Sequence, residues 1–261
     1  MSVPATSGAA RLAELLGSAG RALALTGAGI SVPSGIPDFR SAGTGLWANV
    51  DPMEVAHIDA FRRDPERFWQ FYGQRFALLR DKRPNGAHAA LVELERRGLL
   101  EAVVTQNIDG LHRAAGTRDL IEVHGTIGTS SCLECGERVG LDDVRARLEA
   151  AADGVPRCAA CGSALKPDVV LFGELLPEAA LARASALAAE ADVLLCVGSS
   201  LEVFPIAQLP EITLAAGGAV ALVTKGPTPY DGRAVVKLEG DVVEELSAVV
   251  AALGPGGGGG A

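Results

Sequence analysis

The sequence predicts an α/β fold in which a doubly wound, Rossmann-like parallel sheet carries a second, smaller domain. Short apolar runs of the strand type alternate with helical patterns of about a dozen residues, as in parallel sheets covered by helices on both faces. A glycine-rich turn directly follows the first strand, and two cysteine pairs interrupt the alternation in mid-chain. The 261 residues suffice for one large domain and a smaller module.

The first element is an amphipathic helix, predicted by the spacing of Leu12, Leu15, Leu16 and Ala19 and ended by Gly20. The strand 22–25 follows it. Further strands are expected at residues 102–105, 120–123, 192–197, 219–224 and 234–238, and helices between them at 87–97, 178–190 and 241–253.

Two segments break this alternation. Residues 45–81 are rich in aromatic residues and arginine and indicate short helices, whereas residues 129–167 hold the cysteine pairs and no long apolar period. We expect these two insertions to form the small domain together. The large domain is then discontinuous, and the glycine-rich tail is expected to be disordered. The large domain is predicted at residues 8–44, 82–128 and 168–253, and the tail at 254–261.

Composition narrows the possible partners and the compartment. The 32 acidic and 23 basic residues give a net charge of −9. This charge argues against direct binding to nucleic acid or an anionic membrane, while cationic peptides stay open as partners. No apolar run reaches the ~18 residues of a membrane span, and no export signal is apparent at the start. The odd cysteine count, with Cys196 in a buried strand pattern, favours the cytoplasm.

The cysteine pairs predict a structural zinc site. Cys132 and Cys135 form one Cys-x-x-Cys turn, Cys158 and Cys161 form the other, and 22 residues separate the pairs. Four thiolates at this spacing suit a closed tetrahedral zinc ion that folds a segment too small to fold unaided. Redox thiols and chance spacing are the alternatives.

The turn after the first strand reads Thr26-Gly-Ala-Gly-Ile-Ser31. Its glycines fit a phosphate-binding turn, but Val32 stands where a third glycine would complete the dinucleotide fingerprint. A phosphate site and a purely structural turn therefore both stay open at this point.

Several motifs in one order decide between these readings, because together they resemble the sirtuin family of NAD⁺-dependent protein-lysine deacylases, of bacterial type. The resemblance covers roughly residues 10 to 250. Its motifs are Gly27-Ala-Gly-Ile-Ser31, Gly35-Ile-Pro-Asp-Phe-Arg40, Thr105-Gln-Asn-Ile-Asp-Gly-Leu-His112, His124-Gly125, the cysteine pairs, Lys166-Pro-Asp-Val-Val-Leu-Phe-Gly-Glu174 and Val197-Gly-Ser-Ser-Leu-Glu-Val-Phe-Pro205.

The resemblance implies a reaction and a catalytic set. The nicotinamide–ribose bond of NAD⁺ is cleaved while an acyl-lysine oxygen attacks the ribose, which yields lysine, nicotinamide and O-acyl-ADP-ribose. His124 matches the general base that takes a proton from a ribose hydroxyl. Asn107 and Asp109 match the positions that hold the nicotinamide and its ribose. On position alone, a histidine that caps the end of strand 120–123 is the favoured interpretation of His124.

The resemblance also implies the residues that bind NAD. Phe39 matches the residue that covers the site after nicotinamide leaves, and Arg40 and Gln106 match positions near the phosphates and ribose. The adenosine half falls to the loop 198–200. The expected set is Gly27, Ala28, Gly29, Ile30, Asp38, Phe39, Arg40, Gln106, Asn107, Ile108, Asp109, Gly198, Ser199 and Ser200. One departure is Val223-Thr-Lys225, where many sirtuins have an Ile-Asn pair whose asparagine contacts the adenosine ribose.

The expected partners are proteins or peptides with acylated lysines, and a monomer is compatible with the sequence. Val169, Phe172 and Val203 match the apolar acyl-lysine channel. Tyr72 and Arg75 have the Y-x-x-R spacing of sirtuins that remove succinyl and malonyl groups, although the pair could simply pack and solvate a helix.

Two other functions stay open at the level of sequence. A mono-ADP-ribosyltransferase would use the same site with another acceptor, and a non-enzymatic NAD-sensing or zinc-dependent interaction module would use it for binding alone. The presence of Asn107, Asp109 and His124 favours the deacylase, because the other two functions do not need a base directed at the ribose.

Overall fold

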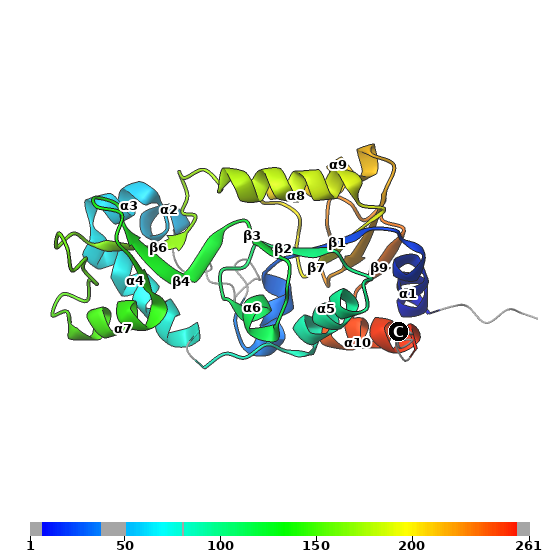
Figure 1. The fold of residues 1–261 in the computed structure, drawn as a ribbon, viewed down its shortest axis with the longest axis horizontal. Helices are drawn as coiled ribbons and strands as arrows, with labels where there is room; N and C mark the ends of the chain where they lie inside the picture. The colour runs from blue at the N-terminus through cyan, green and yellow to red at the C-terminus, as the bar shows by residue number, and fades with distance from the viewer. Residues whose placement is uncertain (1–6, 38–50, 80, 255–261) are drawn as a thin grey trace, which may run out of the picture.

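The computed structural model describes residues 7–37, 51–79 and 81–254 (Figure 1). Its main sheet has six parallel strands in the order β3-β2-β1-β7-β8-β9. This arrangement confirms the predicted Rossmann-like fold class. The strands are β1 (Ala22–Thr26), β2 (Ala102–Thr105), β3 (Leu120–Glu122), β7 (Val193–Val197), β8 (Ala219–Val223) and β9 (Val236–Leu238).

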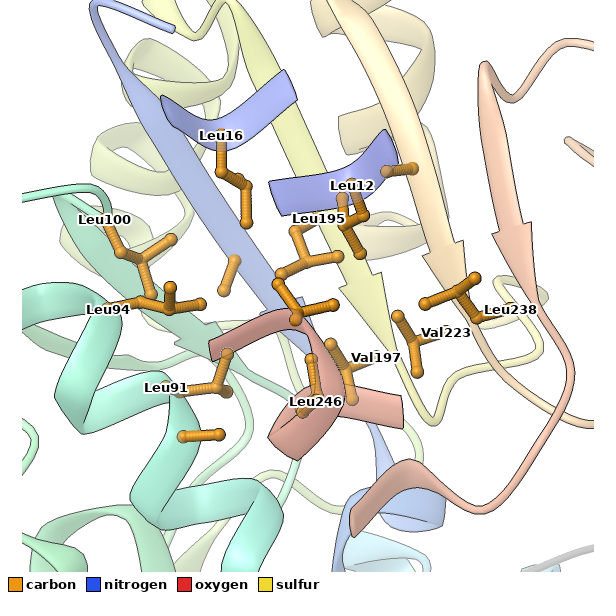
Figure 2. Close-up of a cluster of buried hydrophobic side chains, with 14 of the residues drawn as sticks. Leu12, Leu16, Leu91, Leu94, Leu100, Leu195, Val197, Val223, Leu238 and Leu246 are labelled. Atoms are coloured by element: carbon orange, nitrogen blue, oxygen red, sulfur yellow. The ribbon is translucent and has the colours of Figure 1, made fainter. Parts of the chain in front are cut away.

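Helices cover both faces of this sheet, which explains why every residue of β1 and β7 is buried. On one face lie α1 (Gly8–Ser18), α5 (Gly86–Arg96) and α10 (Val242–Ala252), and on the other α8 (Glu178–Glu190) and α9 (Leu209–Ala215) (Figure 1). Figure 2 shows the first of these layers, in which Leu16, Leu94 and Leu246 converge on the sheet without exposed surface.

A second, antiparallel sheet lies at the other end of the molecule, in the strand order β5-β4-β6 (Figure 1). Aromatic side chains fill the core beside it: Trp69 is buried and donates from Nε1 to the main-chain oxygen of Leu165 at 2.9 Å. The strands are β4 (Gly125–Cys132), β5 (Arg138–Gly140) and β6 (Leu165–Val169). The helices of this part are α2 (Pro52–Val55), α3 (Ile58–Arg63), α4 (Pro65–Leu79) and α7 (Leu141–Ala150).

Several boundaries differ from the sequence expectation. Helix α1 begins at Gly8, a turn earlier than its apolar spacing indicates, because the Ser7 side chain accepts a hydrogen bond from the Ala10 amide. Helix α4 has 15 residues rather than being short. Helix α7 was not predicted, since Val144 is its one fully buried position. The division into domains stays a prediction. Among the described residues, no helix has the length and apolar character that crossing a bilayer requires.

Candidate active site

A cavity of about 1060 Å³ opens at the carboxyl ends of β1, β2, β7 and β8, the edge where open parallel sheets bind their ligands. Its opposite wall comes from the part of the molecule built on the small sheet. The sequence-predicted residues that line it are Gly27, Ala28, Gly29, Tyr72, Gln106, Asn107, Ile108, His124, Val169, Phe172, Gly198, Ser199, Ser200 and Val203.

The glycine turn after β1 opens the 3-10 helix η1 (Ala28–Ser34) and packs against the loop after β7. The Gly29 amide donates to the oxygen of Gly198 at 2.8 Å. A Cβ on Gly29 would lie 2.7 Å from the Gly198 Cα, and one on Gly198, whose φ is +60°, would lie 2.3 Å from the Ile30 nitrogen. These glycines are therefore required for loop packing as well as for an open backbone at the cavity wall.

The polar floor of the cavity is held by hydrogen bonds between neighbouring strand ends. Asn107 is 6% exposed, and its side-chain amide donates to the oxygen of Gly27 at 3.1 Å and to Ser31 Oγ at 3.2 Å. Gln106 Nε2 donates to Ser199 Oγ at 3.0 Å, which joins the loops after β2 and β7. The side chains are thus fixed before any ligand arrives.

Asp109 is fixed from two sides. Its Oδ2 accepts from Ser31 Oγ at 2.7 Å, and its Oδ1 accepts from the Leu111 amide at 2.9 Å, at the start of α6 (Leu111–Ala115). Its carboxylate lies next to the cavity wall rather than in it, since Asp109 is not among the lining residues.

His124 lies between the two sheets, after β3 and immediately before β4. Its Nδ1 is 3.0 Å from the main-chain oxygen of Gln106, and because a carbonyl oxygen only accepts, Nδ1 carries the proton of the neutral ring. Nε2 then has no proton and presents a lone pair. Burial lowers the pKa of His124, and the Gln106 carbonyl opposes this in part. The ring is therefore a neutral base at neutral pH.

The wall opposite the main sheet is tied together through the main chain. The Phe172 amide donates to the oxygen of Ala56 at 2.9 Å, the Ile58 amide donates to the oxygen of Phe172 at 3.0 Å, and the Val170 amide donates to the oxygen of His124 at 2.9 Å. Tyr72 reaches the same cavity from α4 and stacks on Phe68, with ring centroids 4.5 Å apart.

Some predicted residues lie elsewhere. The Ile30 side chain is buried in the core under the sheet and does not line the cavity. Asp38, Phe39 and Arg40, and the side chain of Arg75, lie outside the described residues. Sequence reasoning did not assign the apolar rim formed by Leu175, Leu176, Phe204 and Pro205, or the wall at Asp241 and Val242. Of these residues, Asp241 is the one that the sequence could have indicated, because it follows β9 and caps α10.

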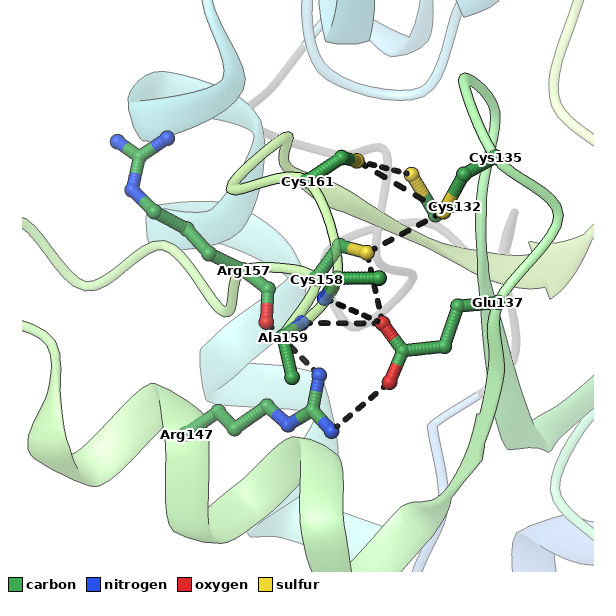
Figure 3. A network of polar contacts seen from close by, with 9 residues as sticks. Cys132, Cys135, Glu137, Arg147, Arg157, Cys158, Ala159 and Cys161 are labelled. Carbon is green, nitrogen blue, oxygen red and sulfur yellow. Dashed lines mark hydrogen bonds and ion pairs between the residues drawn. The ribbon is translucent and has the colours of Figure 1, made fainter.

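Figure 3 shows the four cysteines gathered at the tips of the small sheet. The sulfur of Cys132 lies 3.5 Å from that of Cys161, and the sulfur of Cys135 lies 3.4 Å from that of Cys158. All four sulfurs lie within 4.8 Å of one another. A tetrahedral zinc with bonds of about 2.3 Å needs sulfur–sulfur edges of about 3.8 Å, so the cluster fits this ion.

Glu137 supports the second cysteine turn of this cluster. Its Oε2 lies 2.7 Å from the Cys158 sulfur and accepts from the Ala159 amide at 3.0 Å, while Oε1 pairs with Arg147 at 3.3 Å (Figure 3). Arg147 also donates to the oxygen of Arg157 at 2.8 Å. Both cysteine turns are thereby attached to the small sheet and to α7.

The fold and the site together define the class of protein. It is an α/β enzyme with a dinucleotide-type fold, a histidine base between its two sheets, and a cysteine cluster for a structural metal ion. The chain belongs to the Sir2 family, because the model of that family matches residues 27–205. A relative from Caldivirga maquilingensis named NAD-dependent protein deacetylase is 44% identical over 243 residues, 93% of each chain. A relative from Thermus thermophilus named NAD-dependent protein deacylase is 46% identical over 236 residues, which cover 89% of this chain and 90% of that protein.

Solved structures show the same fold. One of Sir2 with a p53 peptide and NAD⁺ has a TM-score of 0.85 at 41% identity and covers 92% of this chain and 96% of its own. Another, of Sir2Tm bound to a propionylated peptide, has a TM-score of 0.84 at 41% identity with the same coverage.

Proposed function

We propose that this chain is an NAD-dependent protein-lysine deacylase that works in the cavity between the two sheets. The observation that carries the proposal is the position of His124, which lines that cavity with Nε2 unprotonated, opposite the loops that end β1 and β7. A transferase that leaves ADP-ribose on its target needs no such base, and the relatives' names favour the deacylase.

The cavity fits NAD. Gly27, Gly29 and Gly198 line it with main chain that carries no side chain, and its volume suits a dinucleotide with an acyl-lysine beside it. When bound, NAD supplies a nicotinamide leaving group and an electrophilic ribose carbon. The Asn107 amide, held by Gly27 and Ser31, binds the nicotinamide carboxamide, and Asp109 orients the adjoining loop.

The rest of the mechanism falls to His124 and the cavity walls. Nε2 of His124 accepts the proton of a ribose hydroxyl and so makes that oxygen a better nucleophile towards the acyl carbon. The Gln106 carbonyl, bonded at Nδ1, stabilises the imidazolium that forms. Val169, Phe172 and Val203 enclose the aliphatic part of the lysine and exclude water from the reactive sugar.

The four cysteines hold zinc as a structural ion. Its coordination is complete with four thiolates, so it has no open position for a substrate. Its contribution is to join the two cysteine turns and so to stabilise the small sheet, which provides one wall of the active site.

A second candidate activity is the removal of acyl groups that end in a carboxylate. It is favoured by Tyr72 and Ala56, which line the same cavity, because a phenol donates to a carboxylate and a small residue leaves room for it. Arg75 lies one helical turn further along α4. Turnover of acetyl- and succinyl-lysine peptides by the chain and by its Arg75→Met variant tests this activity; equal loss of both would contradict it.

The proposal also covers the domains of the chain, its compartment and its partners. Two separate sheets support a large and a small domain, predicted at residues 8–44, 82–128 and 168–253 and at 45–81 and 129–167, although β4 and β6 of the small sheet each cross a predicted boundary. The five cysteines, none of them in a disulfide, suit the cytoplasm, and acyl-lysine proteins are the partners of this chain.

The decisive experiment measures nicotinamide release from NAD⁺ with and without acylated peptides, together with the mass of the product peptide. Release that depends on the peptide, with a free lysine as product, supports the proposal. A peptide that retains ADP-ribose would contradict it.

A further inference from the structure

One lysine of this chain is buried, which is uncommon for a side chain that carries a full charge. Lys166 lies in β6 and is 7% exposed, and among the lysine, arginine, aspartate and glutamate residues that the structure describes it is the only buried one. It does not line the cavity, and the proposed chemistry does not use it. A buried charge is costly unless it is paired and hydrogen-bonded, so the partners of Lys166 indicate what it does.

Three acceptors take the three protons of the Lys166 ammonium group. Nζ donates to the main-chain oxygens of Val169 at 2.9 Å and Pro167 at 3.2 Å, and it forms an ion pair with Oε2 of Glu174 at 2.9 Å. Glu174 itself lines the cavity. The buried charge is therefore fully paired, and all its partners belong to the stretch of chain that begins in β6 and ends at Glu174.

Glu174 also closes the end of this stretch. Its Oε2 accepts from the Leu171 amide at 2.9 Å, and its own amide donates to the oxygen of Leu171 at 3.0 Å. Glu174 thus bonds both main-chain groups of Leu171. Because Lys166 pairs with the same carboxylate oxygen that accepts from Leu171, the ion pair fixes the acceptor of that amide.

The stretch held in this way is the channel segment (residues 169–174), one wall of the proposed acyl-lysine channel. All six of its residues line the cavity. Lys166 joins its two ends, through the oxygen of Val169 and the carboxylate of Glu174. On the outer side the segment is closely packed, since a Cβ on Gly173, whose φ is +83°, would lie 2.6 Å from Nε2 of His57.

A buried ion pair contributes little net stability, because the desolvation of both charges offsets their attraction. We propose that Lys166 and Glu174 are positioning residues for the acyl-lysine peptide, and that their ion pair holds the channel segment in the conformation that places Val169 and Phe172 along the substrate. The contacts of the pair are those of the structure, whereas its effect on a peptide rests on the proposed function.

Amide hydrogen exchange of the ligand-free full chain tests whether the pair holds the segment. In Lys166→Met we expect exchange in residues 169–174 to accelerate about tenfold or more, while β1 and β7 keep their protection. Unchanged exchange in the segment overturns the proposal. An equal acceleration in β1 and β7 also overturns it, because the variant would then have lost stability throughout.

Glu174→Ala breaks the same pair from its less buried side, where the side chain is 25% exposed. It should release the same six residues, and it provides the exchange measurement if Lys166→Met does not fold. Protection of the segment that survives in Glu174→Ala overturns the proposal.

Calorimetric titration with an acetyl-lysine peptide in the absence of NAD⁺ measures substrate affinity without turnover. Lys166→Met and Glu174→Ala should each raise the Kd of the peptide about fivefold to tenfold, and combining them should add no further loss. Glu174→Gln keeps an acceptor oxygen for the Leu171 amide and should retain most of the affinity. Losses that multiply in the double variant, or a loss in Glu174→Gln as large as in Glu174→Ala, overturn the positioning role.

Arg138→Met is the matched control, because Arg138 pairs with Asp168 at 2.8 Å on the same small sheet but is 62% exposed. It should change neither the peptide Kd nor exchange in the channel segment, and an effect equal to that of Lys166→Met overturns the assignment. The Kd of NAD⁺ should stay the same in every variant; a loss as large as that for the peptide overturns the proposal. If the unmodified chain binds no acetyl-lysine peptide, the proposed function fails, whereas hydrogen exchange still decides whether the pair holds the segment.

Discussion

The Nδ1 atom of His124 lies 3.0 Å from the main-chain oxygen of Gln106, the residue that follows β2. Gln106 contributes its main-chain oxygen to this contact, so a substitution of the Gln106 side chain does not remove it directly. The ring is thereby held in the tautomer that presents a lone pair to the cavity.

Replacing the base tests its role. We expect His124→Ala to lower kcat for deacylation by about 10²- to 10⁴-fold, while NAD⁺ binding changes little, because the ring acts on a hydroxyl rather than anchoring the cofactor. Single-turnover deacylation and calorimetric NAD⁺ titration measure the two quantities. His57→Ala is the control, since His57 caps α3 by accepting from the Asp59 amide; equal kinetic losses in both variants would argue against a base at position 124.

The pH dependence of the reaction follows from the lowered pKa of His124. The neutral ring is the active form, so a pKa below 6.5 keeps the base active into mildly acidic solution. We expect kcat/KM to stay level down to about pH 6.5 and to fall only below it. A profile that already declines between pH 8 and pH 7 would contradict this assignment.

Stability should also fall in acid, through two buried histidines, His88 and His112. Burial lowers the pKa of His112 to about 3 and lowers that of His88 as well. The unfolded chain takes up these protons as the pH falls below 6.5, whereas the folded chain does not. The free energy of unfolding should therefore drop between pH 6.5 and about 3, and His112 alone should account for a loss of about 3 kcal/mol at pH 4.5. Denaturant unfolding of the His112→Leu variant should show a shallower pH dependence; an unchanged slope would count against this.

Removal of zinc should destabilise the small sheet. Cys132→Ala should bind less than one zinc per chain and lower the melting temperature, because three thiolates hold the ion poorly. Cys196→Ala is the matched control, since Cys196 lies buried in β7, away from the cluster. Metal analysis and thermal melts measure both variants. Full zinc content in Cys132→Ala would refute the ligand assignment.

The contact between the glycine loops predicts a steep cost at position 198. Gly198→Ala places a Cβ 2.3 Å from the Ile30 nitrogen on a backbone with φ of +60°, so we expect a loss of about 2 kcal/mol or more. Gly232→Ala meets no atom within 4 Å and should be nearly neutral. If urea unfolding gave the two variants equal stabilities, the loops would accept the added Cβ without a loss of unfolding free energy.

Much of the main sheet was accessible from sequence because its strands are buried on both faces. Such strands appear as continuous apolar runs, and β7 and β8 were predicted nearly to the residue. The small sheet could not be predicted in this way, since β4 contains four threonine or serine residues and two glycines among its eight positions. Its order comes from the cysteine cluster and from the aromatic core around Trp69, both of which depend on contacts distant in sequence.

The site was predicted through motifs rather than through geometry. Position alone favoured a strand cap for His124, and spacing gave no sign that His88 serves the capping box of α5. Hydrogen bonds that join residues some 80 positions apart, such as Asn107 to Gly27, became visible only in the fold.

The shortest crossing of the chain between the two sheets consists of Val123 and His124, since β3 ends at Glu122 and β4 begins at Gly125, whereas the return from β6 to β7 runs through residues 170–192. A rotation of the two sheets against each other that pivots at this crossing would turn about a point beside the imidazole. The cavity walls that hold the peptide and the dinucleotide would then move much further than His124, which would stay almost in place.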